Sequence, residues 1–360
     1  MTTLRVGVDA RAAAEVPAGR GRYVRELLAA LEALEDARDA RFTLYAREPW
    51  GTLDPDRFAW RRIGLPDPAW HLATAMHASR EVDVFLSTNS YLTAWFCRRP
   101  TAVVVYDLVP FVERATAKTS SARIEQATIR PALRRAAALP CISNATRADL
   151  ERLFPAARGK ASTIPLAADA AFAAPVDRPG HPALDRPYVL AVGTLEPRKN
   201  LESLIAAWRN LQPTVRDEHT LALVGPRGWD DAPILAAARD AGAVLLGRVA
   251  EDELRALYAG AACFVYPSLY EGFGLPVLEA MAAGAPVVTS NLSSLPEVAG
   301  AAALLVDPRD PAALGAAIGR VLTDDALAAR LRAAGRARAA TFSWERTARE
   351  TLALLHAIAR

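Results

Sequence analysis

Two adjacent basic residues, Arg198 and Lys199, stand in a loop that follows a short apolar run ending at Val192. A guanidinium can grip two phosphate oxygens and an ammonium acts as a point charge, so the pair suits a diphosphate. A helical pattern begins near Asn200, and positive charge is unfavourable at the positive end of a helix dipole. An anionic ligand would explain both residues, and Gly193 would let it approach the backbone. Solvated side chains in front of a helix are the alternative.

Two glutamates, Glu271 and Glu279, form a second group of residues that could bind a ligand or take part in catalysis. Glu271 lies in a turn that contains Gly272 and Gly274, and Glu279 lies about one turn into the helix that follows. A carboxylate accepts two hydrogen bonds, so each glutamate can hold a vicinal diol, and the glycine N–H groups can meet sugar or phosphate oxygens. The alternative is one glutamate that complements the helix dipole and one on a solvated helix face.

Weaker signals lie in the first half of the chain. The loop Ala18–Tyr23 contains Gly19 and Gly21 and resembles a phosphate-binding turn, although no acidic ribose ligand follows the next strand, which disfavours a dinucleotide enzyme. Tyr106 and Asp107 end a predicted strand. Ser143 precedes a helix that carries Arg147, and helix capping is the simplest role for this serine.

Short β-branched or apolar runs alternate with longer helical segments, which predicts parallel sheets with crossover helices. The expected strands cover 4–9, 42–45, 82–87, 101–106, 188–192, 220–224, 243–246, 263–266, 286–289 and 303–306. The proline-rich segment 173–187 interrupts this rhythm and is a linker candidate. We therefore expect two doubly wound α/β domains, 1–172 and 188–343, that face each other across a cleft, and a C-terminal helix over 344–358.

Bulk properties restrict the classes of protein. The 360 residues carry a net charge of +3 with no block of Lys or Arg, which argues against a nucleic-acid binder. The three cysteines are dispersed and the five histidines show no metal-ligand spacing, so we expect neither a disulfide framework nor a metal site. No apolar run is long enough to span a membrane and no signal peptide is evident, so we expect a cytoplasmic protein.

Four segments in order, GTLEPRKNLESLIAAW, YPSLYEGFG, EGFGLPVLEAMAAGAPVV and SNLSSLPEVAGAAALLVDP, resemble retaining GT-B glycosyltransferases of family 4, also called glycosyl transferases group 1. The third looks like the family's E-x7-E signature, with Glu271 and Glu279 at its ends. The resemblance covers nearly the whole chain. It implies two Rossmann-like domains, a C-terminal helix (344–360) packed back on the first domain, and no metal or other cofactor.

The resemblance also implies roles for individual residues. Glu279 would hold the donor ribose and Glu271 the transferred sugar, while Arg198 and Lys199 would hold the diphosphate. Gly21 would offer its N–H to the distal phosphate from the first domain. The complete set of expected donor-binding residues is Gly21, Gly193, Arg198, Lys199, Arg248, Val249, Glu271, Gly272, Phe273, Gly274, Leu275 and Glu279.

On the acceptor side the resemblance points to Tyr106, Asp107, Ser143 and Arg147, and it places Asp107 with Glu271, Arg198 and Lys199 among the catalytic candidates. Many relatives have His-Asp where this chain has Tyr106-Asp107. A tyrosine hydroxyl donates and accepts hydrogen bonds but is no base at neutral pH.

The resulting hypothesis is transfer of a hexose, with retention, from a nucleotide-sugar to a saccharide or lipid-linked glycan in surface-polysaccharide synthesis. GDP-mannose is the first donor candidate and a UDP-hexose the second. The helix-like stretch 124–138 contains Arg130, Arg134 and Arg135 and suggests peripheral contact with the inner face of the cytoplasmic membrane, unless it is simply a solvated face. The alternatives are a hydrolase with paired carboxylates, a sugar-nucleotide epimerase on the same fold, and a subunit that binds sugar nucleotides without catalysis.

Overall fold

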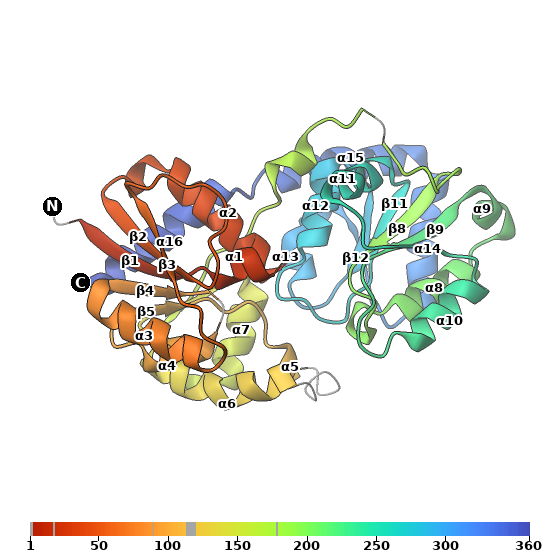
Figure 1. Cartoon of the computed structure of the whole chain (residues 1–360). Coiled ribbons are helices and arrows are strands. Elements are labelled where there is room, and N and C mark those ends of the chain that lie inside the picture. The colour runs from red at the N-terminus through yellow and green to blue at the C-terminus, as the bar shows by residue number, and fades with distance from the viewer. Residues whose placement is uncertain (1–2, 17–18, 89, 113–119, 178) are drawn as a thin grey trace. The chain divides into compact units, whose positions relative to one another are not determined.

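The computed structural model describes residues 3–16, 19–88, 90–112, 120–177 and 179–360 (Figure 1). The chain divides into two compact units, Met1–Leu166 with Ser343–Arg360 (unit 1) and Ala167–Phe342 (unit 2). Each unit has a parallel sheet with helices packed on it, as the alternation of strand and helix patterns predicts.

Unit 1 contains a five-stranded sheet in the order β3-β2-β1-β4-β5, and the pair β6-β7 continues from β5 through isolated bridges such as Val105 to Cys141. Its strands are β1 (Leu4–Asp9), β2 (Ala40–Ala46), β3 (Phe58–Arg62), β4 (Val84–Ser87), β5 (Thr101–Val103), β6 (Leu139–Cys141) and β7 (Ala161–Thr163). Its helices are α1 (Arg11–Glu15), α2 (Arg20–Ala33), α3 (Ala69–Glu81), α4 (Tyr91–Phe96), α5 (Val109–Val112), α6 (Ser120–Arg135), α7 (Asn144–Leu153) and α16 (Trp344–Ala359), with 3-10 turns η1 (Glu35–Ala37) and η3 (Pro155–Ala157).

Unit 2 contains a six-stranded sheet in the order β10-β9-β8-β11-β12-β13. Its strands are β8 (Tyr188–Val192), β9 (Thr220–Val224), β10 (Val244–Gly247), β11 (Cys263–Tyr266), β12 (Val287–Ser290) and β13 (Leu304–Val306). Its helices are α8 (Leu201–Arg209), α9 (Pro213–Glu218), α10 (Ala232–Asp240), α11 (Glu251–Gly260), α12 (Leu275–Ala283), α13 (Leu295–Ala299), α14 (Pro311–Thr323) and α15 (Asp325–Ala339), with 3-10 turns η4 (Ala170–Ala173), η5 (Pro197–Lys199) and η6 (Gly300–Ala302).

The boundary between the units differs from the expected one at residue 172. The chain enters unit 2 at Ala167, because the ring of Phe172 packs edge-on against Tyr258 of unit 2, with 5.7 Å between centroids. The proline-rich segment 173–187 also belongs to unit 2, where the Gly180 N–H donates to the Ala256 carbonyl. Proline content correctly indicated irregular backbone there, but irregular backbone can still pack on a domain.

The C-terminal helix α16 belongs to unit 1, as the family resemblance implies. Ser343 caps it by accepting a hydrogen bond from the Arg346 N–H, and one face of the helix is buried against α2, β4 and β5. Trp344 reaches the Tyr23 ring at 6.1 Å between centroids, and the Thr347 hydroxyl donates to the Pro165 carbonyl at 2.7 Å. The end of the chain therefore completes the core of the unit that its beginning builds.

None of the helices described is both long and apolar enough to cross a lipid bilayer. Within the same described residues, no group of three or more His, Cys, Asp or Glu side chains is placed to hold a metal ion.

Candidate functional site

The basic loop of unit 2 starts where β8 ends. Pro197–Lys199 form the 3-10 turn η5, and Asn200 adopts the left-handed conformation (φ 56°) before α8 begins. The Asn200 side chain fixes this bend by donating to the carbonyls of Pro267 and Pro308 at 3.2 and 2.6 Å. The aliphatic stem of Lys199 passes over Gly193, whose Cβ position would lie 3.4 Å from the lysine Cε. The loop therefore presents two cations from a fixed backbone.

A second strand-end glycine shapes the base of this loop. Gly225 follows β9 with φ +147°, and a Cβ atom there would lie 2.0 Å from the Gly193 carbonyl oxygen. The strand ends at Gly193 and Gly225 can thus lie together only without a side chain at position 225.

We expect Gly225→Ala to lower Tm markedly and to reduce donor binding, because backbone atoms rather than a flexible side chain would have to move. Gly242→Ala is the matched control: its φ is also positive (+66°), yet no atom lies within 4 Å of the added methyl group. The control should cost only about 1–2 kcal/mol from backbone strain. Thermal unfolding of both variants measures the difference, and equal losses would contradict the packing argument.

The acidic loop follows β11, the neighbour of β8 in the sheet. The Glu271 N–H donates to the Ser293 hydroxyl at 2.9 Å, and the Ser294 hydroxyl donates to the carbonyls of Glu271 and Phe273. Ser293 itself holds a positive φ of 53°. Gly274 precedes α12 with φ +111°, a conformation that glycine adopts without steric cost. These bonds fix the backbone on both sides of the Glu271 side chain.

The two loops meet at a single atom, the Oε1 oxygen of Glu271. The Lys199 ammonium lies 2.6 Å from it and the Arg198 guanidinium 2.9 Å. The hydroxyls of Ser268 and Tyr266 donate to the same oxygen at 2.6 and 3.0 Å. Lys199 also donates to the Tyr266 hydroxyl at 2.6 Å. The sequence-predicted residues Arg198, Lys199 and Glu271 therefore form one contiguous cluster.

The protonation states follow from burial and from these neighbours. Burial alone would raise the pKa of Glu271, but the charges of Lys199 and Arg198 hold it down to about 2. Burial lowers the pKa of the Lys199 amine, although Glu271 opposes that shift. Burial raises the pKa of Tyr266 well above its usual value, so its hydroxyl stays neutral. Glu271 is thus an anion over the whole physiological range.

A further carboxylate balances the second cation. Glu196 Oε1 lies 2.6 Å from the Arg198 guanidinium, and Arg198 also donates to the Tyr270 carbonyl at 2.7 Å. Two cations and two carboxylates thus stand together, with side chains only 11–17% exposed. The cations are held in place by the protein itself, which is the arrangement that preorganised electrostatic stabilisation requires.

Glu279 lies on the buried face of α12 and accepts a hydrogen bond from the Tyr258 hydroxyl at 3.2 Å. A buried carboxylate on a regular helix has a well-defined direction, which suits a residue that grips a diol.

We expect Tyr258→Phe to raise the donor KM about three- to tenfold with little change in kcat, because it removes one bond that orients Glu279. Tyr188→Phe is the control, since Tyr188 is also buried in unit 2 but donates to a backbone carbonyl, that of Leu257. Steady-state kinetics with varied donor decides, and an unchanged KM for Tyr258→Phe would contradict a positioning role.

The remaining donor-side predictions have different surroundings. Phe273 packs its ring edge-on against Phe342, with 5.9 Å between centroids, so its side chain belongs to the core and only its backbone is available. Gly272 and Leu275 flank it in the acidic loop and the first turn of α12. Arg248 and Val249 follow β10 at the edge of the sheet, with Arg248 exposed. Their contact with a nucleotide base stays a prediction.

The other predicted residues belong to unit 1. Gly21 is the second residue of α2, and a Cβ atom there would lie 1.7 Å from the Val16 carbonyl oxygen, so packing of α2 against the preceding turn also requires this glycine. Its approach to a phosphate stays a prediction.

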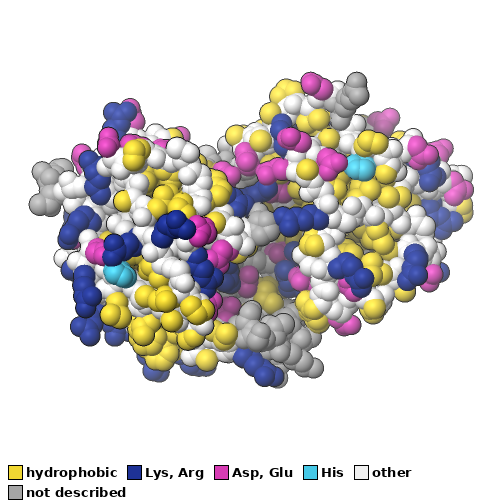
Figure 2. Space-filling view, in the orientation of Figure 1, with side chains coloured by type: hydrophobic (Ala, Val, Ile, Leu, Met, Phe, Trp, Pro, Cys, Tyr) yellow, Lys and Arg dark blue, Asp and Glu magenta, His cyan; other side chains and the backbone are white. Residues whose placement is uncertain are grey.

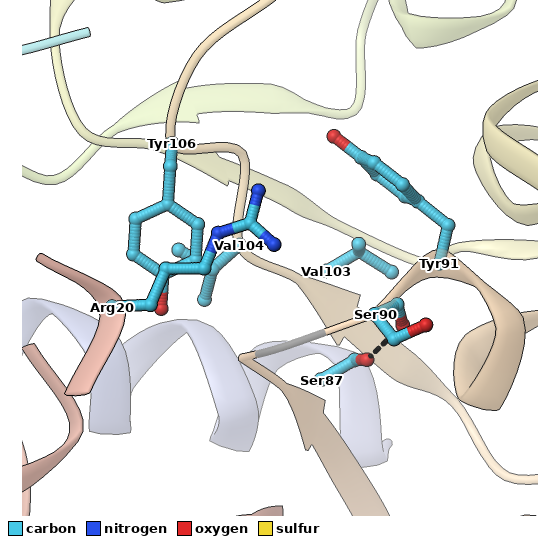
Figure 3. A pocket seen from close by; sticks show the side chains of 7 residues that line it. All are labelled: Arg20, Ser87, Ser90, Tyr91, Val103, Val104 and Tyr106. Atoms are coloured by element: carbon cyan, nitrogen blue, oxygen red, sulfur yellow. Dashed lines mark hydrogen bonds between the residues drawn. The ribbon is translucent and has the colours of Figure 1, made fainter. Parts of the chain in front are cut away.

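Tyr106 lies beyond β5, which ends at Val103 rather than at the predicted residue 106. Its ring packs edge-on against Tyr23 at 5.3 Å, and the Arg20 guanidinium lies 5.3 Å from the ring centroid. Figure 3 shows Tyr106 with Arg20, Tyr91 and Ser90 around an open hollow at the carboxyl ends of β4 and β5. Burial raises the pKa of Tyr106 well above its usual value, so it offers only a neutral hydroxyl.

The acceptor-side candidates Asp107 and Ser143 have local structural roles. Asp107 Oδ1 accepts from the Val109 N–H at 3.2 Å and orders its own turn. The Ser143 hydroxyl is fully buried and caps α7 by accepting from the Thr146 N–H at 3.0 Å. Arg147, in the first turn of α7, is half-buried. Capping, the simplest role proposed for Ser143, is what its contacts show.

Sequence reasoning missed the partners that complete the cluster: Glu196, Tyr266, Ser268, Ser293 and Ser294. Tyr266 is the last residue of a predicted strand, Ser268 lies two residues beyond it, and Glu196 is two residues from Arg198. Position at a strand end was therefore the signal that could have found these three. The two serines come from the loop after β12 and reach Glu271 only through the fold.

A family model described as Glycosyl transferases group 1 matches residues 176–338. This range contains both loops of the cluster and Glu279.

Among curated relatives, O-antigen chain mannosyltransferase B of Escherichia coli is 46% identical over 169 residues, which cover 46% of this chain and 44% of that protein. MMP alpha-(1->4)-mannosyltransferase of Mycolicibacterium hassiacum is 46% identical over 117 residues, covering 31% of this chain and 28% of that protein. The match thus spans less than half of each relative's length.

Solved structures match over the whole chain at low identity. Sucrose-phosphate synthase of Thermosynechococcus elongatus covers 99% of both chains with a TM-score of 0.77 and 22% identity. Anabaena Alr3699/HepE in complex with UDP-glucose covers 98% of this chain and 99% of that one, with a TM-score of 0.73 and 18% identity. At such identities the likeness concerns the fold.

Proposed function

We propose that this chain, whose residues 176–338 match the family model of Glycosyl transferases group 1, is a member of that family and a retaining glycosyltransferase that uses a nucleotide-sugar donor. Its α/β fold of two Rossmann-like units is GT-B. The observation that carries the proposal is the cluster in which Lys199 and Arg198 meet the Glu271 carboxylate at 2.6 and 2.9 Å.

The cluster supports departure of a nucleoside diphosphate. As the bond between the anomeric carbon and the phosphate oxygen breaks, negative charge grows on the phosphate, where Arg198 and Lys199 would neutralise it. The acceptor hydroxyl would form its bond to the anomeric carbon on the face that the leaving group vacates, which retains the configuration. Its proton would pass to the departing phosphate oxygen.

The donor we propose first is GDP-mannose, because several relatives that match part of this chain are named mannosyltransferases. A UDP-hexose is the second candidate, since Alr3699/HepE, which shares the fold, has been solved with UDP-glucose. The acceptor we propose is a saccharide or lipid-linked glycan of a surface polysaccharide, in keeping with the relative named for O-antigen chains.

For a hydrolase with Glu271 and Glu279 as paired carboxylates, the site excludes Glu271 as the acid. Glycosidases need one carboxylic acid that is protonated near neutral pH. The pKa of Glu271 is held at about 2 by two cations, so it cannot serve as that acid. An epimerase would release an epimerised sugar, and a subunit without catalytic activity would form no product. An assay of the products therefore distinguishes both from a transferase.

A lipid-linked acceptor would bring the enzyme to the inner face of the cytoplasmic membrane. Helix α6 carries exposed arginines at positions 130, 134 and 135, and Arg135 also donates to the carbonyl of Cys97, the residue after α4, at 3.3 Å. Such a basic face would favour anionic headgroups.

The test is donor consumption with and without acceptor. The chain is incubated with GDP-mannose or UDP-glucose, with and without octyl α-mannoside, and nucleotide release and sugar products are measured. Acceptor-dependent release with an α-linked product supports the proposal. Release without acceptor that yields free sugar or an epimerised sugar contradicts it, as does binding of nucleotide, detected by a raised Tm, without turnover of any donor.

A further inference from the structure

Unit 1 exposes two large aromatic side chains at the end of α4. Trp95 and Phe96 are 37% and 43% exposed, and their rings stack on each other with 5.1 Å between centroids. The preceding residues of the same helix, Thr93 and Ala94, are buried, so α4 places its core face on one side and this pair on the other. Exposed neighbouring aromatic rings of this size are unusual unless something covers them.

The neighbouring helix α3 extends the apolar surface. Leu72 and Met76, one helical turn apart, are 46% and 49% exposed, and α3 packs directly on α4. Figure 2 shows hydrophobic side chains gathered over the part of unit 1 where α3 and α4 lie, with Lys and Arg side chains along the border. We call Leu72, Met76, Trp95 and Phe96 the aromatic patch.

Arginines from α3, from α6 and from the segment after α4 border the aromatic patch. Arg98 and Arg99 follow α4 and are tied to the end of α3, where the Arg98 N–H and the Arg99 guanidinium donate to the side chain and carbonyl of Ser79. Arg80 is exposed in the last turn of α3. Arg135, at the end of α6, donates to the Cys97 carbonyl right after the aromatic pair.

Acidic side chains near this edge are already paired. Glu81 lies 3.2 Å from the Arg61 guanidinium and 3.1 Å from the His77 ring, and Asp83 pairs with Arg5 at 2.6 Å. The border therefore carries an excess of positive charge beside exposed aromatic rings.

We infer that the aromatic patch and its arginine border bind the surface of an anionic lipid bilayer. Tryptophan is enriched where hydrocarbon meets water, because its ring is apolar and its N–H is polar. Arginines around the edge, rather than among the rings, can reach phosphate headgroups while the rings insert between acyl chains.

This inference deepens the proposed membrane contact by adding the inserting element to the basic helix α6, and it does not depend on the choice of donor. It brings α4, α3 and the end of α6 to the bilayer as one surface, because the contacts above join these three helices.

The test is cosedimentation of the full chain with vesicles of phosphatidylcholine and phosphatidylglycerol (3:1) and with phosphatidylcholine alone. We expect binding to the anionic vesicles, weakened at least tenfold by Trp95→Ser with Phe96→Ser. Arg80→Glu with Arg98→Glu should weaken it similarly and remove most of its salt dependence. Trp229→Ser is the matched control, since Trp229 of unit 2 is equally exposed at 37%.

Tm and circular dichroism confirm that each variant is folded. Unchanged binding by the aromatic variant, or absence of binding by the unaltered chain, overturns the inference. So does self-association that Trp95→Ser and Phe96→Ser abolish without any effect on vesicles, which would assign the patch to a second copy. The aromatic variant should transfer sugar to water-soluble octyl α-mannoside as well as the unaltered chain does. A failed transfer assay would therefore contradict only the proposed function, and the vesicle assay would still test membrane binding.

Discussion

Replacement of both Arg198 and Lys199 by alanine should lower kcat for sugar transfer by at least about 10³-fold, since each group alone is the kind of donor whose loss costs about 10²–10³. The variant should also be less stable, because the Glu271 carboxylate would remain buried after losing the cations 2.6 and 2.9 Å away. Removing the partners of a buried charge typically costs about 3–5 kcal/mol. Steady-state kinetics and urea unfolding measure the two effects.

A triple variant separates chemistry from folding. Adding Glu271→Gln to the two alanines removes the uncompensated charge, so it should recover much of the lost stability while activity stays low. Arg320→Ala, at an exposed position on α14, is the control for loss of positive charge in unit 2. Full activity in the double alanine variant would refute the assignment of the diphosphate to this loop.

Glu271→Gln alone should lower kcat about 100-fold or more while leaving the fold intact, since the amide has nearly the shape of the carboxylate. The loss follows because Glu271 orients both cations, and a neutral amide would let them repel each other. Donor turnover is compared with that of Glu202→Gln, an exposed glutamate on α8. A kcat within threefold of the unaltered chain would show that the anion is dispensable.

The same substitution has a signature in the pH dependence of stability. The folded-state pKa of Glu271 is about 2, below its ordinary value of 4.5, so the folded chain holds this proton less tightly than the unfolded chain. Its contribution is therefore fully present above about pH 4.5 and is lost as pH falls towards 2, by roughly 3 kcal/mol in all. Urea unfolding from pH 5 to 3 should show a steeper loss for the unaltered chain than for Glu271→Gln. Parallel curves would contradict the pairing.

The strands of unit 2 were the most predictable part of the fold. Strands β8, β9 and β11 begin and end at the predicted residues because each is a short apolar run, buried on both faces, with a glycine or proline directly beyond it. Strands β3, β6 and β7 were missed. β3 is an edge strand that ends in two exposed arginines, and β6 contains a proline, so neither shows the usual pattern.

The site was predictable in its members but not in its connections. Arg198, Lys199 and Glu271 stood out by type and by position at strand ends. That Glu271 binds both cations depends on β8 and β11 being neighbours in the sheet, although more than 70 residues separate the loops, as the contact between Lys199 and Glu271 illustrates. The order of strands in a sheet cannot be predicted from local sequence. The ion pairs of Glu271 with Arg198 and Lys199, and the low pKa of Glu271 that results from them, were therefore evident only in the structure.

The return of α16 to unit 1 has a consequence for how such proteins can diverge. Because unit 1 is built from residues 1–166 and 343–360, a single genetic crossover cannot exchange it whole between two relatives. A chimera that joins the first half of one parent to the second half of another would set a foreign α16 against α2, at the contact of Trp344 with Tyr23. The two segments that build unit 1 must therefore be inherited together, and an engineer who exchanges unit 1 would need to transplant both.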